Sequence, residues 1–140
     1  MVSFFKNKER NEMNDDYSYS KIAALLIHTA KIDEAYDKKE KDIIKKTLIE
    51  LGAEQVEINN IIIKAEAKEE ESHQILEFTR EIKNTNEKFK IKIVETLWRI
   101  IYSDKTSDIY ESNLMRRLTG LLYIDNKTMG DIKARIKKNN

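Results

Sequence analysis

Residues 25–44 have the sequence LLIHTAKIDEAYDKKEKDII, and this stretch decides the fold. An apolar segment comes first, an acidic segment follows it, and paired isoleucines then begin a second apolar pattern. Ile22, Leu25, Leu26 and Thr29 follow the spacing i, i+3, i+4 and i+7, which is typical of one face of an α-helix. We therefore expect a helix that runs into an acidic loop and a second helix that leaves it.

The same arrangement recurs 71 residues further along the chain, where residues 96–115 have the sequence TLWRIIYSDKTSDIYESNLM. Acidic residues occupy matched positions in the two copies, and apolar residues match on both sides of them. The matched acidic residues are Asp33, Asp37 and Glu40 in the first copy and Asp104, Asp108 and Glu111 in the second. The repeat predicts a duplicated helix–loop–helix unit.

The composition favours helices along the whole chain. Its 140 residues include no proline and only three glycines, and these are the residues that most often interrupt helices. Charged residues make up 36% of the chain, as expected for amphipathic helices with solvated outer faces. We predict an all-α protein in which residues 1–17 form a flexible or weakly helical tail and residues 18–140 form a single helical domain.

The spacing of apolar residues places seven helices. The first is expected to begin at residue 18 or 20 and to end at residue 33. The others are expected at 37–51, 54–68, 72–84, 87–103, 108–122 and 126–137. Ser18 or Ser20 is expected to cap the first helix, Gly52 to end the second, and the acidic run 69–71 to form a solvated connection. The expected core joins helices from both copies and contains Leu26, Ile44, Leu97, Trp98 and Leu118.

Charge and residue usage exclude several classes of function. With a net charge of +1, the chain lacks the excess of basic residues that is typical of a dedicated nucleic-acid binder. The absence of cysteine excludes disulfides and thiolate metal sites in this chain. No apolar run approaches the roughly 20 residues of a membrane span, and the first residues lack a signal-peptide core, so we expect a cytoplasmic protein. No nucleophile or phosphate-loop motif is present, which favours a non-catalytic protein.

The acidic loops have two interpretations from spacing alone. Asp37 and Asp108 each precede a helix, and Glu40 and Glu111 follow three residues later, which is the spacing of a capping box. Two carboxylate-bearing loops that face each other would also suit Ca²⁺ or Mg²⁺, although neither has the spacing of an EF-hand.

Asp33 and Asp104 distinguish these two interpretations. Each stands at the end of the preceding helix, where the helix dipole disfavours negative charge. Capping the following helix gives them no role. Their acidity is therefore the sequence feature that most favours a cation site.

Several further segments carry a family resemblance. The tripeptide FTR at 78–80, VETLWRIIYSD at 94–104, LMRRL at 114–118 and LLYI at 121–124 are similar to stand-alone bacterial proteins of the tellurite-resistance TerB-like family. The resemblance covers about residues 20–137, and it extends to the N-terminal domain of the DjlA co-chaperone. It implies an all-α fold of about seven helices with pseudo-twofold symmetry.

The resemblance also implies a function. The six matched acidic residues would lie near one another and bind a divalent cation, and the protein would act as an interaction or stress-associated module with a protein partner. The family usually has glycine where this chain has Glu34 and Lys105, and a lysine beside Asp104 would oppose a cation. A metal-free adaptor that docks on a protein or a membrane surface, through Phe4, Phe5 or an apolar groove, is the alternative. An acid/base enzyme that uses the clustered carboxylates is a third.

Overall fold

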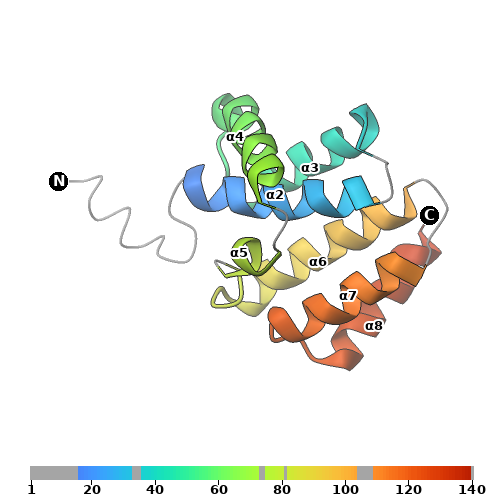
Figure 1. Cartoon of the computed structure of the whole chain (residues 1–140). Coiled ribbons are helices and arrows are strands. Elements are labelled where there is room, and N and C mark those ends of the chain that lie inside the picture. Colours follow the sequence, from blue (N-terminus) through green and yellow to red (C-terminus); the bar gives the residue numbers. More distant parts are fainter. Residues whose placement is uncertain (1–15, 33–35, 73–74, 81, 104–108, 140) are drawn as a thin grey trace.

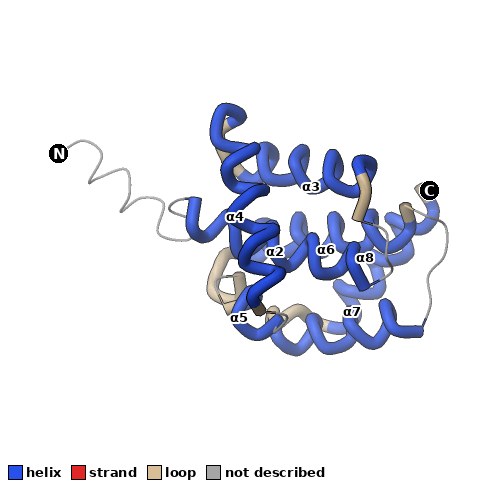
Figure 2. The backbone as a smooth tube through the Cα atoms, turned by 45° about the horizontal axis from the view of Figure 1, so that its top comes forward, coloured by secondary structure: helices blue, strands red, loops and turns tan. Residues whose placement is uncertain are grey.

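A computed structural model describes residues 16–32, 36–72, 75–80, 82–103 and 109–139 of the chain. These ranges contain seven α-helices and one 3₁₀ turn, and no strand (Figures 1 and 2). The elements are α2 (Asp16–Ile32), α3 (Lys38–Leu51), η1 (Gln55–Glu57), α4 (Ile58–Glu71), α5 (Ile75–Thr79), α6 (Glu87–Tyr102), α7 (Ile109–Leu121) and α8 (Asn126–Lys138). The prediction of an all-α fold is confirmed.

Helix α2 runs through the middle of the molecule, with α3 and α4 on one side of it and α5 and α6 on the other (Figure 1). Every residue from 22 to 27 is 0% exposed. A helix with a single apolar stripe would leave its other face in water, so α2 is enclosed more completely than the i, i+3, i+4 pattern predicted.

The predicted start of this helix is wrong. Ser18 and Ser20 lie inside α2, which begins at Asp16, and Ser20 is fully buried. The Tyr19 hydroxyl donates a 3.3 Å hydrogen bond to the Leu51 carbonyl, so the first turns of α2 contact α3. A serine cap contributes only about 1 kcal/mol, so tertiary contacts decide the boundary. The rest of the predicted tail, residues 1–15, lies outside the described residues.

Helix α3 has the ends that the sequence predicts. Asp37 is its N-cap, and Gly52 follows its last turn with a φ of 121°. The amide of Ala53 donates to the Leu48 carbonyl at 2.9 Å, which closes the turn. Only glycine adopts such a φ without strain, so the prediction for Gly52 is confirmed.

The segment between α4 and α6 differs from the prediction in two ways. Residues 69–71 belong to α4 rather than to a solvated connection, and Glu69 is 2% exposed. The helix predicted over 72–84 is reduced to the five residues of α5. The hydroxyl of Thr79 bonds to the Leu76 carbonyl at 3.2 Å, and such local side-chain bonds compete with helix continuation.

The predicted core is confirmed. Leu26, Ile44, Leu97 and Leu118 are 0% exposed and Trp98 is 3% exposed, all within one hydrophobic cluster. The indole nitrogen of Trp98 lies 3.4 Å from the sulfur of Met129, which joins α6 to α8. No helix in the described ranges combines the length and apolarity that crossing a membrane requires.

Candidate functional site

The six predicted acidic residues are only partly within the described ranges. Asp37 and Glu40 are described with their side chains, whereas Asp33, Asp104 and Asp108 lie outside the described residues. Glu111 belongs to α7, where its backbone position is described. In the first acidic loop, the structure therefore describes the residues from Tyr36 onward.

Asp37 and Glu40 form a capping box at the start of α3. The Asp37 Oδ1 atom accepts hydrogen bonds from the backbone amides of Lys39 at 3.0 Å and of Glu40 at 3.5 Å. In return, the Glu40 Oε1 atom accepts from the Asp37 amide at 3.4 Å. The capping interpretation is confirmed in the first copy.

Glu40 also reaches the end of α6. Its side chain is buried, and its Oε2 atom accepts a 2.6 Å hydrogen bond from the Ser103 hydroxyl. The Lys39 ammonium donates to the Ser103 backbone carbonyl at 2.6 Å. We call these four residues, Asp37, Lys39, Glu40 and Ser103, the loop junction. Because Ser103 directly precedes Asp104, the loop junction places the cap of the first copy against the start of the second acidic loop.

A second contact holds the first loop against α4. The Tyr36 hydroxyl donates to Glu66 Oε2 at 2.6 Å, and the Lys41 ammonium lies 3.1 Å from the same oxygen. Burial, together with the bond to Glu66, raises the pKa of Tyr36. Burial alone would raise the pKa of Glu66, but the bonds from Tyr36 and Lys41 outweigh it and the pKa is lowered. These residues fix the exit of the first loop.

A buried carboxylate lies where α2 passes α4. The side chain of Glu69 is 3% exposed, and it accepts from Lys31 at 2.9 Å and contacts His28 Nδ1 at 3.1 Å. Lys31 also bridges to Glu70 at 3.1 Å. Burial would raise the pKa of Glu69, but the bonds from Lys31 and His28 outweigh that effect and lower it. This network orients the last turns of α2, which lead into the first acidic loop.

A groove of about 500 Å³ opens between the last turns of α2 and helix α7. It is lined by His28, Ile32, Asn113, Leu114 and Arg117. In the sequence, Ile32 directly precedes Asp33, and Asn113 follows Glu111 by two residues. The described lining of this α2–α7 groove combines apolar walls with two basic side chains and carries no carboxylate.

The described part of the site is thus a set of caps and ion pairs. Within the described ranges, no three histidine or acidic side chains come close enough together to hold a metal ion. The sequence did not predict the contacts of Ser103. Its hydroxyl bonds to Glu40, 63 residues away, and its carbonyl accepts from Lys39, 64 residues away. A serine at the end of an apolar helix gives no sequence signal for such a partner.

Comparison with known proteins places the chain in a family. No curated protein and no solved structure matches it. The family model described as "Tellurite resistance protein TerB" matches residues 20–134. This range includes most of α2 and most of α8, and therefore both copies of the repeated unit. The chain belongs to the TerB family of tellurite resistance proteins.

Proposed function

We propose that this TerB-family chain is a non-catalytic binding module that holds a divalent cation, Ca²⁺ or Mg²⁺, between its two acidic loops. The observation that carries the proposal is the contact between Glu40 and Ser103, because it brings the first loop to the residue that opens the second. The chain has no cysteine and so offers no thiol for redox chemistry. A binding role in tellurite resistance fits these features better than catalysis.

The chemistry of the described donors fits a hard cation in part. Asp37 uses one carboxylate oxygen, Oδ1, for both of its capping bonds, which leaves Oδ2 for a ligand. Carboxylate oxygens are the ligands that Ca²⁺ and Mg²⁺ prefer. In this proposal Asp33, Asp104 and Asp108 join Asp37 around the cation. Glu40, and by the repeat Glu111, hold the two loops in place.

The metal-free adaptor is the second candidate, and the position of Lys39 favours it. Its ammonium group lies at the loop junction, 2.6 Å from the Ser103 carbonyl, where a positive charge opposes a bound cation. Both carboxylate oxygens of Glu40 also accept a hydrogen bond already, one from Ser103 and one from the Asp37 amide. In this alternative the α2–α7 groove would receive a segment of a partner protein, and Arg117 would pair with an acidic group on it.

Thermal unfolding with and without cation separates the two candidates. If the loops bind Ca²⁺ or Mg²⁺, the cation stabilises the folded state by mass action, by about 2.7 kcal/mol at a free concentration of 100 times Kd. We expect millimolar Ca²⁺ or Mg²⁺ to raise the melting temperature relative to chelator. The double variant Asp33→Asn with Asp104→Asn should abolish the rise, and isothermal calorimetry should give the stoichiometry.

The matched control removes two acidic groups elsewhere. Within the described residues, Asp42 and Asp131 form only surface pairs, with lysines four residues before them. The double variant Asp42→Asn with Asp131→Asn should therefore keep the cation-dependent rise. A wild-type protein that melts at the same temperature in cation and in chelator would rule out the cation site and leave the adaptor.

A further inference from the structure

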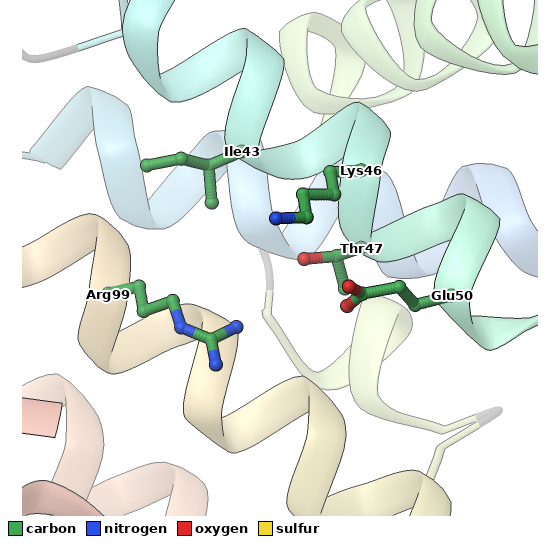
Figure 3. Close-up of a pocket in the computed structure, with 5 residues that line it drawn as sticks. All are labelled: Ile43, Lys46, Thr47, Glu50 and Arg99. Atoms are coloured by element: carbon green, nitrogen blue, oxygen red, sulfur yellow. The ribbon is translucent and has the colours of Figure 1, made fainter. Parts of the chain in front are cut away.

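A second concave site lies between α3 and α6, and its lining is basic. The pocket has a volume of about 170 Å³ and is lined by Ile43, Lys46, Thr47, Glu50 and Arg99. Figure 3 shows the polar ends of Lys46, Arg99 and Glu50 directed toward the space between the two helices. The volume is below the roughly 300–1,000 Å³ of pockets for drug-sized ligands. The α3–α6 pocket therefore suits a small group rather than a nucleotide.

The charges around this pocket do not cancel. Glu50 forms a 2.7 Å ion pair with Lys92, which balances the single carboxylate of the lining. In the part of the chain that the structure describes, the side chains of Lys46 and Arg99 form no ion pair or hydrogen bond. The hydrogen bond from Lys92 lowers the pKa of Glu50, and the nearby charges of Lys46 and Arg99 add to this effect. Two cationic donors thus remain available to an anion.

Thr47 contributes an acceptor to the pocket. Its hydroxyl lies 2.9 Å from the Thr96 hydroxyl, and Thr96 donates its proton to the Lys92 carbonyl at 3.0 Å. Either hydroxyl can donate in this bond. When Thr96 gives its single proton to the Lys92 carbonyl, Thr47 is the donor to Thr96. Its oxygen can then only accept a hydrogen bond from a ligand. The Glu50 carboxylate is also only an acceptor when it is ionised.

We propose that the α3–α6 pocket binds a phosphate group that carries a proton. Lys46 and Arg99 supply charge-assisted hydrogen bonds to its ionised oxygens. Ammonium and guanidinium groups are the side chains that commonly bind phosphate in this way. Glu50 and Thr47 accept from its P–OH group. Sulfate has the same shape but no proton at neutral pH, so its oxygens would face the Glu50 carboxylate without a hydrogen bond. The pocket should therefore prefer phosphate to sulfate.

An NMR titration of the full chain at pH 7 and constant ionic strength tests this proposal. Inorganic phosphate should cause saturable shifts at the amides of Lys46, Thr47 and Arg99, and sulfate should bind about tenfold or more weakly, because charge-assisted hydrogen bonds to the proton are lost. Absence of saturable shifts, or equal affinity for the two ions, would contradict the proposal. Glycerol 3-phosphate, titrated in parallel, is a second test of the proton. Its second pKa is about 6, so at pH 7 it is mostly unprotonated and should bind more weakly than inorganic phosphate, whereas equal binding would contradict the proposal.

Variants assign the binding to these side chains. Lys46→Gln and Arg99→Gln should each weaken phosphate binding about tenfold. The matched controls Lys64→Gln and Arg116→Gln remove the same charges from exposed positions on α4 and α7 and should leave it unchanged. Controls that weaken binding equally would point to net charge alone.

Glu50→Gln provides a readout that depends on selectivity rather than on folding. An amide can donate to an unprotonated oxygen, so this variant should bind sulfate more tightly and bring the phosphate-to-sulfate ratio toward one. A ratio that stays at the wild-type value would show that Glu50 does not recognise the proton.

Discussion

The Ser103 hydroxyl lies 2.6 Å from the Glu40 carboxylate and joins the end of α6 to the first turn of α3 across 63 residues of sequence. Glu40 is buried, and its Oε2 atom accepts from this hydroxyl, which also lies 2.8 Å from the Ile100 carbonyl. We expect Ser103→Ala to lower the free energy of unfolding by about 1–3 kcal/mol, as measured by urea denaturation. Ser103→Thr keeps the hydroxyl and should retain most of the stability. A loss below about 0.5 kcal/mol for Ser103→Ala would mean that Glu40 finds another donor.

Leu97 lies in the shared core, where it is 0% exposed, whereas Leu76 is 57% exposed. Leu97→Ala should lower the free energy of unfolding by about 2–5 kcal/mol, because it removes buried methyl groups and leaves a cavity. The same change at Leu76 should stay within about 0.5 kcal/mol. Chemical denaturation of the two variants side by side checks the difference, and similar losses would contradict the burial of Leu97.

Gly52 and Gly130 should respond to alanine with opposite signs. Gly52 has a φ of +121°, and a Cβ there would lie 2.8 Å from the Tyr19 hydroxyl. Gly52→Ala should destabilise the protein by more than about 1 kcal/mol, through backbone strain and displacement of Tyr19. Gly130 lies inside α8, and a Cβ at this position would meet no atom within 4 Å, so Gly130→Ala should stabilise by about 0.5–1 kcal/mol. Thermal unfolding of both variants measures the two signs.

The buried Glu69 predicts a dependence of stability on pH. Its pKa in the folded state is lowered from the ordinary value of 4.5. A lowered folded pKa contributes stability above the unfolded pKa, and this contribution is lost as the pH falls through the folded pKa. The difference in stability between wild type and Glu69→Gln should therefore be largest near neutral pH and should shrink below about 4.5. Lys31→Met removes a donor to Glu69 and should weaken the same pH dependence. Parallel stability curves from pH 7 to pH 3 would contradict this account.

Local signals allowed most of the helices to be predicted from the sequence. The capping box of Asp37 and Glu40 and the glycine at position 52 act within a few residues of the chain, so spacing reveals them. The start of α2 depends on contacts such as that between Tyr19 and Leu51. Those contacts join distant segments, and no local pattern encodes them.

The polar contacts around the loops were harder to predict for the same reason. An acidic run next to a helix end is usually solvated, but Glu69 is buried because His28 and Lys31 approach it from α2. Lys46 and Arg99 look like ordinary surface charges in the sequence, and only the packing of α3 against α6 places them on one pocket. The role of Asp33, Asp104 and Asp108 in a cation site remains a prediction, because these residues lie outside the described ranges.

The full enclosure of α2 has a consequence for synthesis of the chain on the ribosome. Residues 22–27 leave the ribosome well before α6, which ends at Tyr102 and covers them. At about 5–20 residues per second, this delay leaves the side of α2 that packs against α6 uncovered for several seconds. Arrested nascent chains that stop before α6 should bind a holdase chaperone, and chains long enough to expose α6 should release it. The nascent chain thus needs a chaperone to cover α2 until α6 has been synthesised, whereas the folded protein does not.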